Sequence, residues 1–141
     1  GKIRWVGLSN VTAEQIREAL TVVPVATVQN RFSPFFREVE TNGVLKACVE
    51  LGLGFLAYSP VGGVRLHKKL ATHPETARVA KRRGLTPHQV VLAWVMSRAP
   101  VVIPIPGASR PENARASAAI AGAVLSPADL SEITAAAFPT D

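Results

Sequence analysis

Four short apolar runs, each followed by a segment with helical periodicity, constrain the fold of this chain more than any other feature. The runs are rich in aliphatic and β-branched residues and occupy positions 3–8, 25–29, 54–58 and 101–103. Strands that are apolar along their whole length are typical of a parallel sheet whose faces are covered by helices. The pattern therefore predicts an α/β chain built from four parallel βα units.

The helical segments carry start and stop signals. Three pairs have the spacing of an N-cap side chain and its partner at the third helical position: Thr12 with Gln15, Thr86 with Gln89, and Ser126 with Asp129. Gly52 and Gly84 are placed to end helices over about 41–51 and 75–83. Further helices are expected from Thr86, over about 110–121 and up to about residue 137, so the third unit holds one extra helix and another follows the fourth.

Two architectures fit four βα units: an open doubly wound sheet and half of a (β/α)8 barrel. A complete barrel typically needs ~250 residues, whereas this chain has 141. We expect one domain over 1–141. The chain opens without Met just before a strand, which suggests a piece of a longer protein. Half a barrel leaves strand edges unpaired and one sheet face partly bare, so it would need its missing half or a second copy.

Composition narrows the class of protein. No apolar run is long enough for a membrane span, and no signal peptide opens the chain. The single cysteine, Cys48, lies in an apolar helical pattern, which favours a buried thiol and a cytoplasmic location. The net charge of +6 favours anionic partners. Nucleic acid is the less favoured partner, because the basic clusters 68–69 and 81–83 lack interleaved aromatics and are expected to be solvated.

Polar residues follow each predicted strand at its carboxyl end, where α/β proteins collect ligands. They are Ser9 and Asn10, Gln29 and Asn30, Tyr58 with Ser59 and Pro60, and the segment 104–110. The opposite strand ends carry residues that look structural. Ser, Asn and Pro also end strands for reasons of turn geometry, so the pattern alone leaves a structural explanation open.

The segment Gly107-Ala108-Ser109-Arg110 combines small residues with a permanent cation at the start of a helix. Small residues allow the backbone to approach an anion, Ser109 is expected to cap the helix, and the guanidinium of Arg110 suits a phosphate. The same residues are compatible with an ordinary capped helix and a solvated arginine. Both interpretations stay open at this point.

Other candidate chemistry is weaker. Tyr58 suits stacking better than acid catalysis, because no lysine lies near it in the sequence. Ser59 lacks the Gly-x-Ser-x-Gly pattern of a nucleophilic serine. The three histidines are isolated and the chain has few aspartates, so we expect neither a metal site nor a catalytic triad.

Four segments occur in a familiar order and spacing: KIRWVGLSN, VATVQNRFSP, LGFLAYSPVGG and VVIPIPGASRPEN. Together they resemble the C-terminal half of an aldo-keto reductase, an NADP(H)-dependent carbonyl reductase. The resemblance implies half of a (β/α)8 barrel containing strands five to eight. It also implies a small-molecule aldehyde or ketone as the substrate of the complete enzyme, with no membrane and no nucleic acid involved.

The resemblance implies cofactor-binding roles for particular residues. Ser9, Asn10 and Gln29 match the groups that hold the nicotinamide carboxamide, and Tyr58 matches the aromatic that stacks on its ring. Ser59, Pro60, Val61 and Gly62 match the loop along the pyrophosphate, and Gly107, Ala108, Ser109 and Arg110 match the segment around the 2′-phosphate. Asn113 and Ser117 stand where the family often has Arg or Gln and then Asn, towards the adenine.

The family's catalytic Asp, Tyr, Lys and His belong to the first four βα units, which nothing in this chain matches. The resemblance therefore implies no catalytic residue here, and we expect the isolated chain to be inactive. Three hypotheses follow: the cofactor half of a reductase, a non-catalytic nucleotide-binding or self-associating module of the same fold, and a basic nucleic-acid-binding protein.

Overall fold

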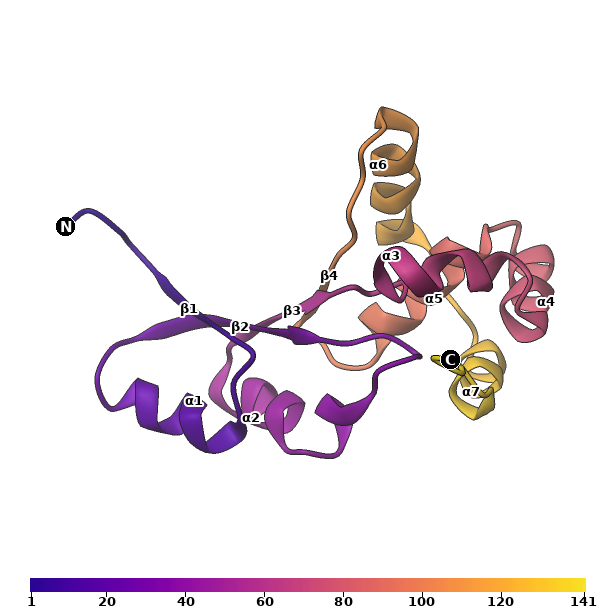
Figure 1. The fold of residues 1–141 in the computed structure, drawn as a ribbon. Coiled ribbons are helices and arrows are strands. Elements are labelled where there is room, and N and C mark those ends of the chain that lie inside the picture. The colour runs from indigo at the N-terminus through magenta and orange to yellow at the C-terminus, as the bar shows by residue number, and fades with distance from the viewer.

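A four-stranded parallel sheet organises the molecule, and the computed structural model describes all residues from 1 to 141. The strands are β1 (Val6–Ser9), β2 (Val25–Arg31), β3 (Gly54–Tyr58) and β4 (Val102–Ile105). They pair in sequence order, β1-β2-β3-β4, and every pairing is parallel. The predicted class and strand order are confirmed (Figure 1).

The first strand differs from its prediction. Residues 3–5 precede β1, and the side chains of Ile3 and Trp5 are 73% and 74% exposed rather than buried. The reason is that β1 is an edge strand, and its pairing with β2 begins only where Val6 lies opposite Val25.

Seven α-helices and three 3₁₀-helices connect and flank the strands. The α-helices are α1 (Ala13–Leu20), α2 (Val44–Leu51), α3 (Gly63–Leu66), α4 (Pro74–Arg83), α5 (Pro87–Ser97), α6 (Pro111–Ala118) and α7 (Pro127–Ala135). The 3₁₀-helices are η1 (Glu38–Glu40), η2 (His67–Ala71) and η3 (Ala119–Gly122). All three predicted capping boxes are present, at the starts of α1, α5 and α7.

Several helix boundaries depart from the sequence predictions. Helix α2 begins at Val44 rather than near residue 41, because Thr41 closes the unpredicted η1 and the side chain of Asn42 accepts a bond from the Val44 N–H. The short α3 and η2 were not predicted. The glycine ends are confirmed: Gly52 and Gly84 both adopt left-handed φ values of 66° at the ends of α2 and α4.

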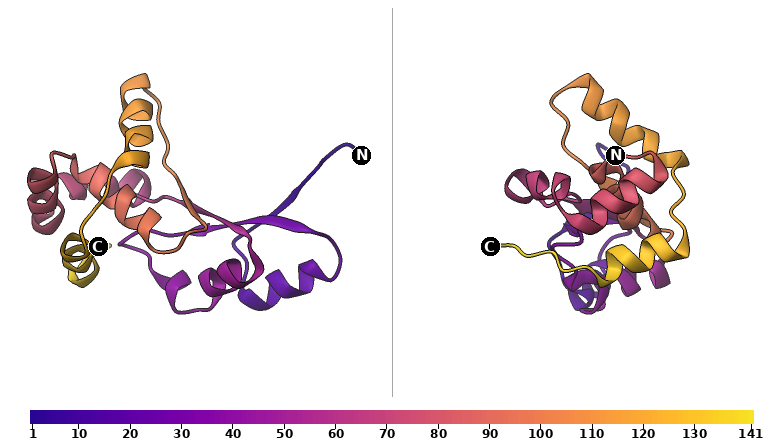
Figure 2. Two further views of the ribbon diagram at one scale, coloured as in Figure 1. Left: turned by 180° about the vertical axis from the view of Figure 1, so that it is seen from behind. Right: turned by 90° about the vertical axis from the view of Figure 1, so that its right-hand side faces the viewer.

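The two faces of the sheet have different surroundings. Paired residues of a parallel sheet share a face, so Val28, Phe55 and Val102 point to one side, where all three are buried. Helices α1 and α2 cover β1 to β3 on this side, whereas no helix covers the other side of these strands (Figure 1). Helix α6 stands away from the sheet beyond β4 in every view (Figure 2).

We call the uncovered side of the sheet the open face. It carries the residues that alternate along each strand with those facing the covered side. Its residues are Gly7, Ser9, Thr27, Gln29, Arg31, Gly54, Leu56, Tyr58, Ile103 and Ile105, none of which is buried. Ile103 and Ile105 are 51% and 39% exposed. The expected bare face of a half-barrel is therefore present, and it leads directly to the carboxyl ends of the strands.

The core lies on the covered side. Cys48 is fully buried within it, as its helical pattern predicts. Trp94 of α5 is also fully buried, and its ring lies 5.9 Å from that of Phe32. This packing fixes the loop that follows β2, and with it the position of one strand end at the open face.

Candidate functional site

A hydrogen-bonded chain of side chains joins the ends of β1 and β3. The Tyr58 hydroxyl donates to Oδ1 of Asn10 over 3.0 Å, and Nδ2 of Asn10 donates to Oγ of Ser9 over 3.2 Å. The backbone N–H of Asn10 also donates to the carbonyl of Gln29. The structure thus brings together four of the predicted site residues at one edge of the open face.

Backbone strain occurs at the same edge. Asn10 and Ser59 are the non-glycine residues with positive φ, at 55° and 50°, and each directly follows a strand. Such conformations cost of order 1–3 kcal/mol and cluster at ligand sites. The positive φ redirects the chain immediately after β1 and β3.

Gln29 lies opposite Ser9 in the sheet, on the open face. Its amide forms no hydrogen bond within the protein, so one carbonyl acceptor and two N–H donors remain available. A side-chain amide of this kind pairs well with a carboxamide ligand.

Asn30, the neighbour of Gln29, points to the other side of the sheet and has a positioning role that the sequence did not reveal. Its side chain exchanges two hydrogen bonds with the backbone of Val11, over 2.9 and 3.2 Å, and so fixes the loop after β1.

The loop Ser59–Gly63 follows β3 and turns tightly. The Gly62 N–H donates to the Ser59 carbonyl over 2.9 Å, and Gly62 itself has φ 88°. A Cβ at Gly62 would lie 2.6 Å from Cβ of Leu66 and 2.9 Å from the Phe35 ring. Only glycine fits here, because both the conformation and the space exclude a side chain.

Two hollows open beside this loop. One, of about 430 Å³, is lined by Arg31, Phe36, Ser59, Gly62, Gly63, Val64, Arg65, Leu66 and Thr140. The other, of about 370 Å³, is lined by Asn10, Val11, Thr12, Asn30, Arg31, Glu38, Val39, Asn42 and Tyr58. Pro60 is buried and Val61 half-buried, so these two predicted residues support the loop rather than face a hollow.

The predicted anion segment lies apart from this cluster. Gly107, Ala108, Ser109 and Arg110 are exposed on the connection from β4 to α6, which rises away from the sheet (Figure 1). Farther along α6, Asn113 is exposed and Ser117 half-buried. These residues form no hydrogen bond or ion pair with the residues at the ends of β1 to β3.

The expected cap by Ser109 is wrong. Arg110 is the N-cap of α6, in an extended conformation and with no side-chain hydrogen bond to the helix. The cause is Pro111 at the first helical position, because a residue before proline is held out of the helical region. The cap therefore falls one residue later than predicted, and the Arg110 side chain stays free.

The basic cluster 81–83 is exposed, as expected, but two of its arginines also form ion pairs. Arg82 and Arg83 form ion pairs of 2.6 Å with the two carboxylate oxygens of Asp129, whose side chain is only 1% exposed. Burial raises the pKa of Asp129, but hydrogen bonds from Ser126, Arg82 and Arg83 outweigh it and hold the pKa well below its usual range. These arginines join α4 to α7 through Asp129, and their side chains remain 47% and 36% exposed.

The geometry of the sheet and its polar edge defines a class of fold. Four parallel strands, helices on one side and polar groups at the carboxyl ends are the arrangement of half a (β/α)8 barrel with its ligand edge. The sequence model of the Aldo/keto reductase family matches residues 1–137, and the chain belongs to that family. No group of three or more His, Cys, Asp or Glu side chains lies close enough to hold a metal ion, and no helix has the length and hydropathy to cross a membrane.

Solved structures agree with this assignment. An aldo-keto reductase from Klebsiella pneumoniae, crystallised with NADPH, is 33% identical, with a TM-score of 0.84 over 94% of this chain and 48% of its own. A second structure from Klebsiella pneumoniae, with NADP and acetate, is 34% identical, with a TM-score of 0.83 and the same coverage. Aldose reductase from Giardia lamblia is 25% identical, with a TM-score of 0.82 over 95% of this chain and 45% of its own. The chain thus spans about half the length of these structures.

Proposed function

We propose that this chain is the cofactor-binding half of an NADP(H)-dependent oxidoreductase that reduces aldehydes or ketones to alcohols. The observation that carries the proposal is the Tyr58–Asn10–Ser9 hydrogen-bonded chain beside the free amide of Gln29, on the open face. The family assignment and the NADPH and NADP complexes of similar structures support it. The domain 1–141 and a cytoplasmic location form part of the proposal.

The residues present fit the cofactor. The half-buried ring of Tyr58 offers a flat surface for a nicotinamide, and Gln29 with Ser9 and Asn10 offers donors and acceptors for its carboxamide. The tight loop from Ser59 through Pro60 and Val61 to Gly62 would follow the pyrophosphate. When bound, the cofactor supplies the hydride, and the chain's own residues bind and orient it.

The adenosine end would be held by the exposed segment after β4. Arg110 is free of carboxylates and can pair with the 2′-phosphate, while Gly107, Ala108 and Ser109 allow a close approach. Asn113 and Ser117 would face the adenine. In this proposal the segment acts separately from the nicotinamide residues.

We further propose that residues 1–141 alone do not reduce carbonyls. Within this chain Tyr58 is committed to Asn10, and a positioned proton donor is worth ~10²–10⁴-fold in rate. The test compares purified residues 1–141 with the full-length gene product that contains them, by following NADPH oxidation with a simple aldehyde. We expect turnover from the full-length product only; steady turnover by residues 1–141 would contradict this part of the proposal.

A second candidate is a non-catalytic module that associates through the open face. Ile103 and Ile105 on that face, and Trp5 beside it, are exposed apolar side chains of the kind that mark interaction surfaces. Light scattering of residues 1–141, with Ile103→Asp as the disrupting variant, separates the candidates. Dimers that Ile103→Asp dissociates, without NADPH binding in any preparation, would favour this alternative.

A further inference from the structure

Three of the arginines that lack a carboxylate partner follow successive strands of the sheet. Ion pairs to carboxylates are formed by Arg17, Arg37, Arg78, Arg82, Arg83 and Arg98. Among those without such a pair, Arg31 ends β2, Arg65 lies on α3 just after β3, and Arg110 follows β4. Each of three successive strands therefore brings one uncompensated cation to its carboxyl end.

Arg31 is held in a defined position although it is exposed. Its guanidinium carbon lies 3.8 Å from the centroid of the Phe36 ring, a cation–π contact that orients the planar fork. Arg31 lies opposite Tyr58 in the sheet and shares the open face with it. It also lines both hollows, so it stands between the nicotinamide residues and the loop after β3.

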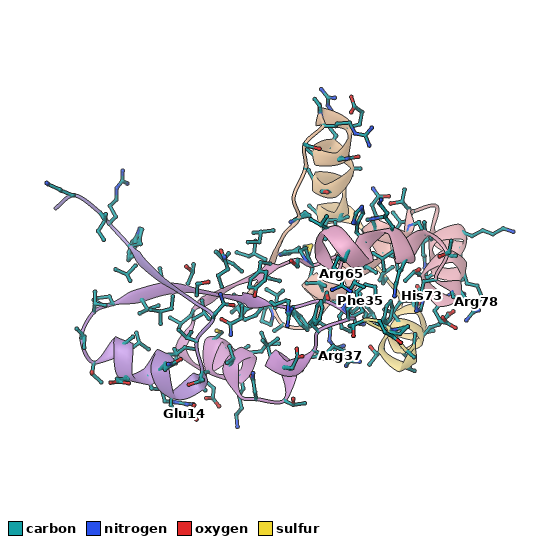
Figure 3. The ribbon with its side chains drawn as sticks, in the orientation of Figure 1. Glu14, Phe35, Arg37, Arg65, His73 and Arg78 are labelled. Carbon is teal, nitrogen blue, oxygen red and sulfur yellow. The ribbon has the colours of Figure 1, made fainter.

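Arg65 faces the same hollow from α3. Figure 3 shows Arg65 on α3, and its side chain lines this hollow. Leu66 and Phe35 pack together beneath it and fix α3 against the loop that follows β2. No acidic residue lines this hollow, whereas the hydroxyls of Ser59 and Thr140 do. Its side chains thus present two permanent cations and two neutral hydroxyl donors.

The tight loop after β3 borders the same hollow as the two arginines. A side chain at Gly62 is excluded by Leu66 and Phe35, and a Cβ at Gly63 would lie 3.2 Å from Oγ of Ser59. The loop therefore stays tight, and its residues Ser59, Gly62 and Gly63 line the hollow together with the two arginines. Two guanidinium forks beside such a loop match a diphosphate, which accepts several charge-assisted hydrogen bonds at once.

We propose that Arg31 and Arg65, which line one hollow with the Ser59–Gly63 loop, clamp the cofactor's diphosphate, as binding residues beyond those that the family resemblance assigns. The inference rests on the proposed function, since it names further contacts of the same cofactor. Because the charges and the hydroxyls lie in one hollow, the clamp binds a diphosphate without any nicotinamide. Inorganic pyrophosphate therefore competes with NADPH.

The test uses the full-length gene product and calorimetric titration with inorganic pyrophosphate at fixed ionic strength. Arg31→Gln and Arg65→Gln each weaken binding about tenfold or more, as expected for loss of a charged hydrogen bond. Arg4→Gln is the matched control: Arg4 also lacks a carboxylate partner, but it precedes β1 at the other end of the strands. We expect the pyrophosphate affinity of Arg4→Gln to stay within about twofold of wild type.

Three outcomes of these measurements overturn the clamp. Unchanged pyrophosphate affinity in both Arg31→Gln and Arg65→Gln removes it, and an equal loss in Arg4→Gln reduces it to general charge attraction. Arg31→Lys keeps the charge and guards against misfolding, and we expect an affinity between those of Arg31→Gln and wild type. A higher KM for a carboxylate-bearing aldehyde in Arg31→Gln, with pyrophosphate binding unaltered, would assign Arg31 to the substrate and also overturn the clamp.

NADPH titration separates failure of the clamp from failure of the proposed function. If the wild type binds NADPH and the double variant Arg31→Gln/Arg65→Gln binds it equally well, the clamp is wrong and the proposed function stands. If the wild type binds no NADPH, the proposed function is wrong, and the pyrophosphate affinities still decide whether the hollow is a diphosphate site.

Discussion

The hydroxyl of Tyr58 donates a 3.0 Å hydrogen bond to Oδ1 of Asn10, and this bond joins the ends of two strands that are not neighbours in the sheet. The bond passes across the end of β2 and holds the tyrosine ring at a fixed angle to the open face. Asn10, which accepts this bond, has a left-handed conformation with φ 55°. Stacking geometry and backbone strain at this edge are therefore linked through one contact.

The first prediction separates the ring from the hydroxyl of Tyr58. Tyr58→Phe keeps the flat surface and loses one partly exposed hydrogen bond, so NADPH affinity of the full-length protein falls about threefold. Tyr58→Ala also removes the ring, and the loss reaches about tenfold or more. Fluorescence titration with NADPH measures both. Equal losses of affinity in the two variants would show that NADPH binding depends on the hydrogen bond to Asn10 rather than on stacking against the ring.

The second prediction concerns the tight loop after β3. Gly62→Ala suffers both a positive φ and overlap with Leu66 and Phe35. Gly84→Ala is the matched control, since Gly84 also has positive φ but has no atom within 4 Å of a built Cβ. We expect Gly84→Ala to lower the free energy of unfolding by about 1 kcal/mol, and Gly62→Ala by about 1–3 kcal/mol more.

Urea unfolding of both variants measures this difference. If the two substitutions lower the free energy of unfolding equally, the loop has room for a methyl group at position 62. The overlap with Leu66 and Phe35 is then wrong. If Gly62→Ala costs more, the variant is also expected to bind NADPH more weakly, because Leu66 and the Phe35 ring would have to shift beside the hollow.

The third prediction addresses cofactor choice. Arg110→Ala in the full-length protein weakens NADPH binding by about tenfold or more, because a charge-assisted contact to the 2′-phosphate is lost. The affinity for NADH, which lacks that phosphate, changes little. Parallel titrations with both nucleotides provide the measurement, with Arg4→Ala as the charge control. A similar loss for NADH would mean that Arg110 does not contact the 2′-phosphate.

The parts of the structure that could be predicted from the sequence are those set by short-range rules. Capping boxes such as Thr12 with Gln15 and helix ends at Gly52 depend on neighbours a few residues away, and they are confirmed. The parallel sheet was predicted from the alternation of strands and helices, whereas the sequential strand order of half a barrel was implied by the family resemblance. The polar strand ends also predicted that Ser9, Asn10, Gln29 and Tyr58 would meet.

What the sequence could not supply depends on contacts between distant residues. The pairing of Arg82 and Arg83 with Asp129 joins residues 46 or 47 positions apart, so the ion pairs of this exposed basic run could not be predicted from the run itself. The hydrogen bond between the Val11 N–H and the Asn30 side chain joins residues 19 positions apart. The position of the α6 cap was predictable in principle, since Pro111 restricts the residue before it.

The fourth prediction concerns the single thiol. Cys48 is fully buried, and burial raises its pKa to about 11. At pH ~8 the thiol is therefore almost entirely protonated and shielded, and it reacts slowly with a disulfide reagent in the folded protein. Reaction of the same chain in concentrated guanidinium chloride is the control. Rapid stoichiometric reaction without denaturant would contradict the burial of this helix face.

The fifth prediction is a pH dependence of stability that originates at Asp129. Its carboxylate caps α7 through Ser126 and pairs with Arg82 and Arg83 from α4. Asp129→Asn keeps the shape but removes the charge, and we expect the free energy of unfolding at neutral pH to fall by about 2 kcal/mol or more. Glu18→Gln, an exposed carboxylate without an ion pair, is the control and changes it by less than about 0.5 kcal/mol.

The sign of the pH effect follows from the lowered pKa of Asp129. A carboxyl that binds its proton more weakly in the folded state stabilises that state above its unfolded pKa of ~3.9, and this contribution is lost as the pH falls below that value. The gap between wild type and Asp129→Asn is therefore constant from pH ~7 to ~5 and narrows below pH ~4. Denaturant titrations across this range measure it. A gap that does not narrow in acid would show that Asp129 joins α4 to α7 through its shape and hydrogen bonds rather than through its charge.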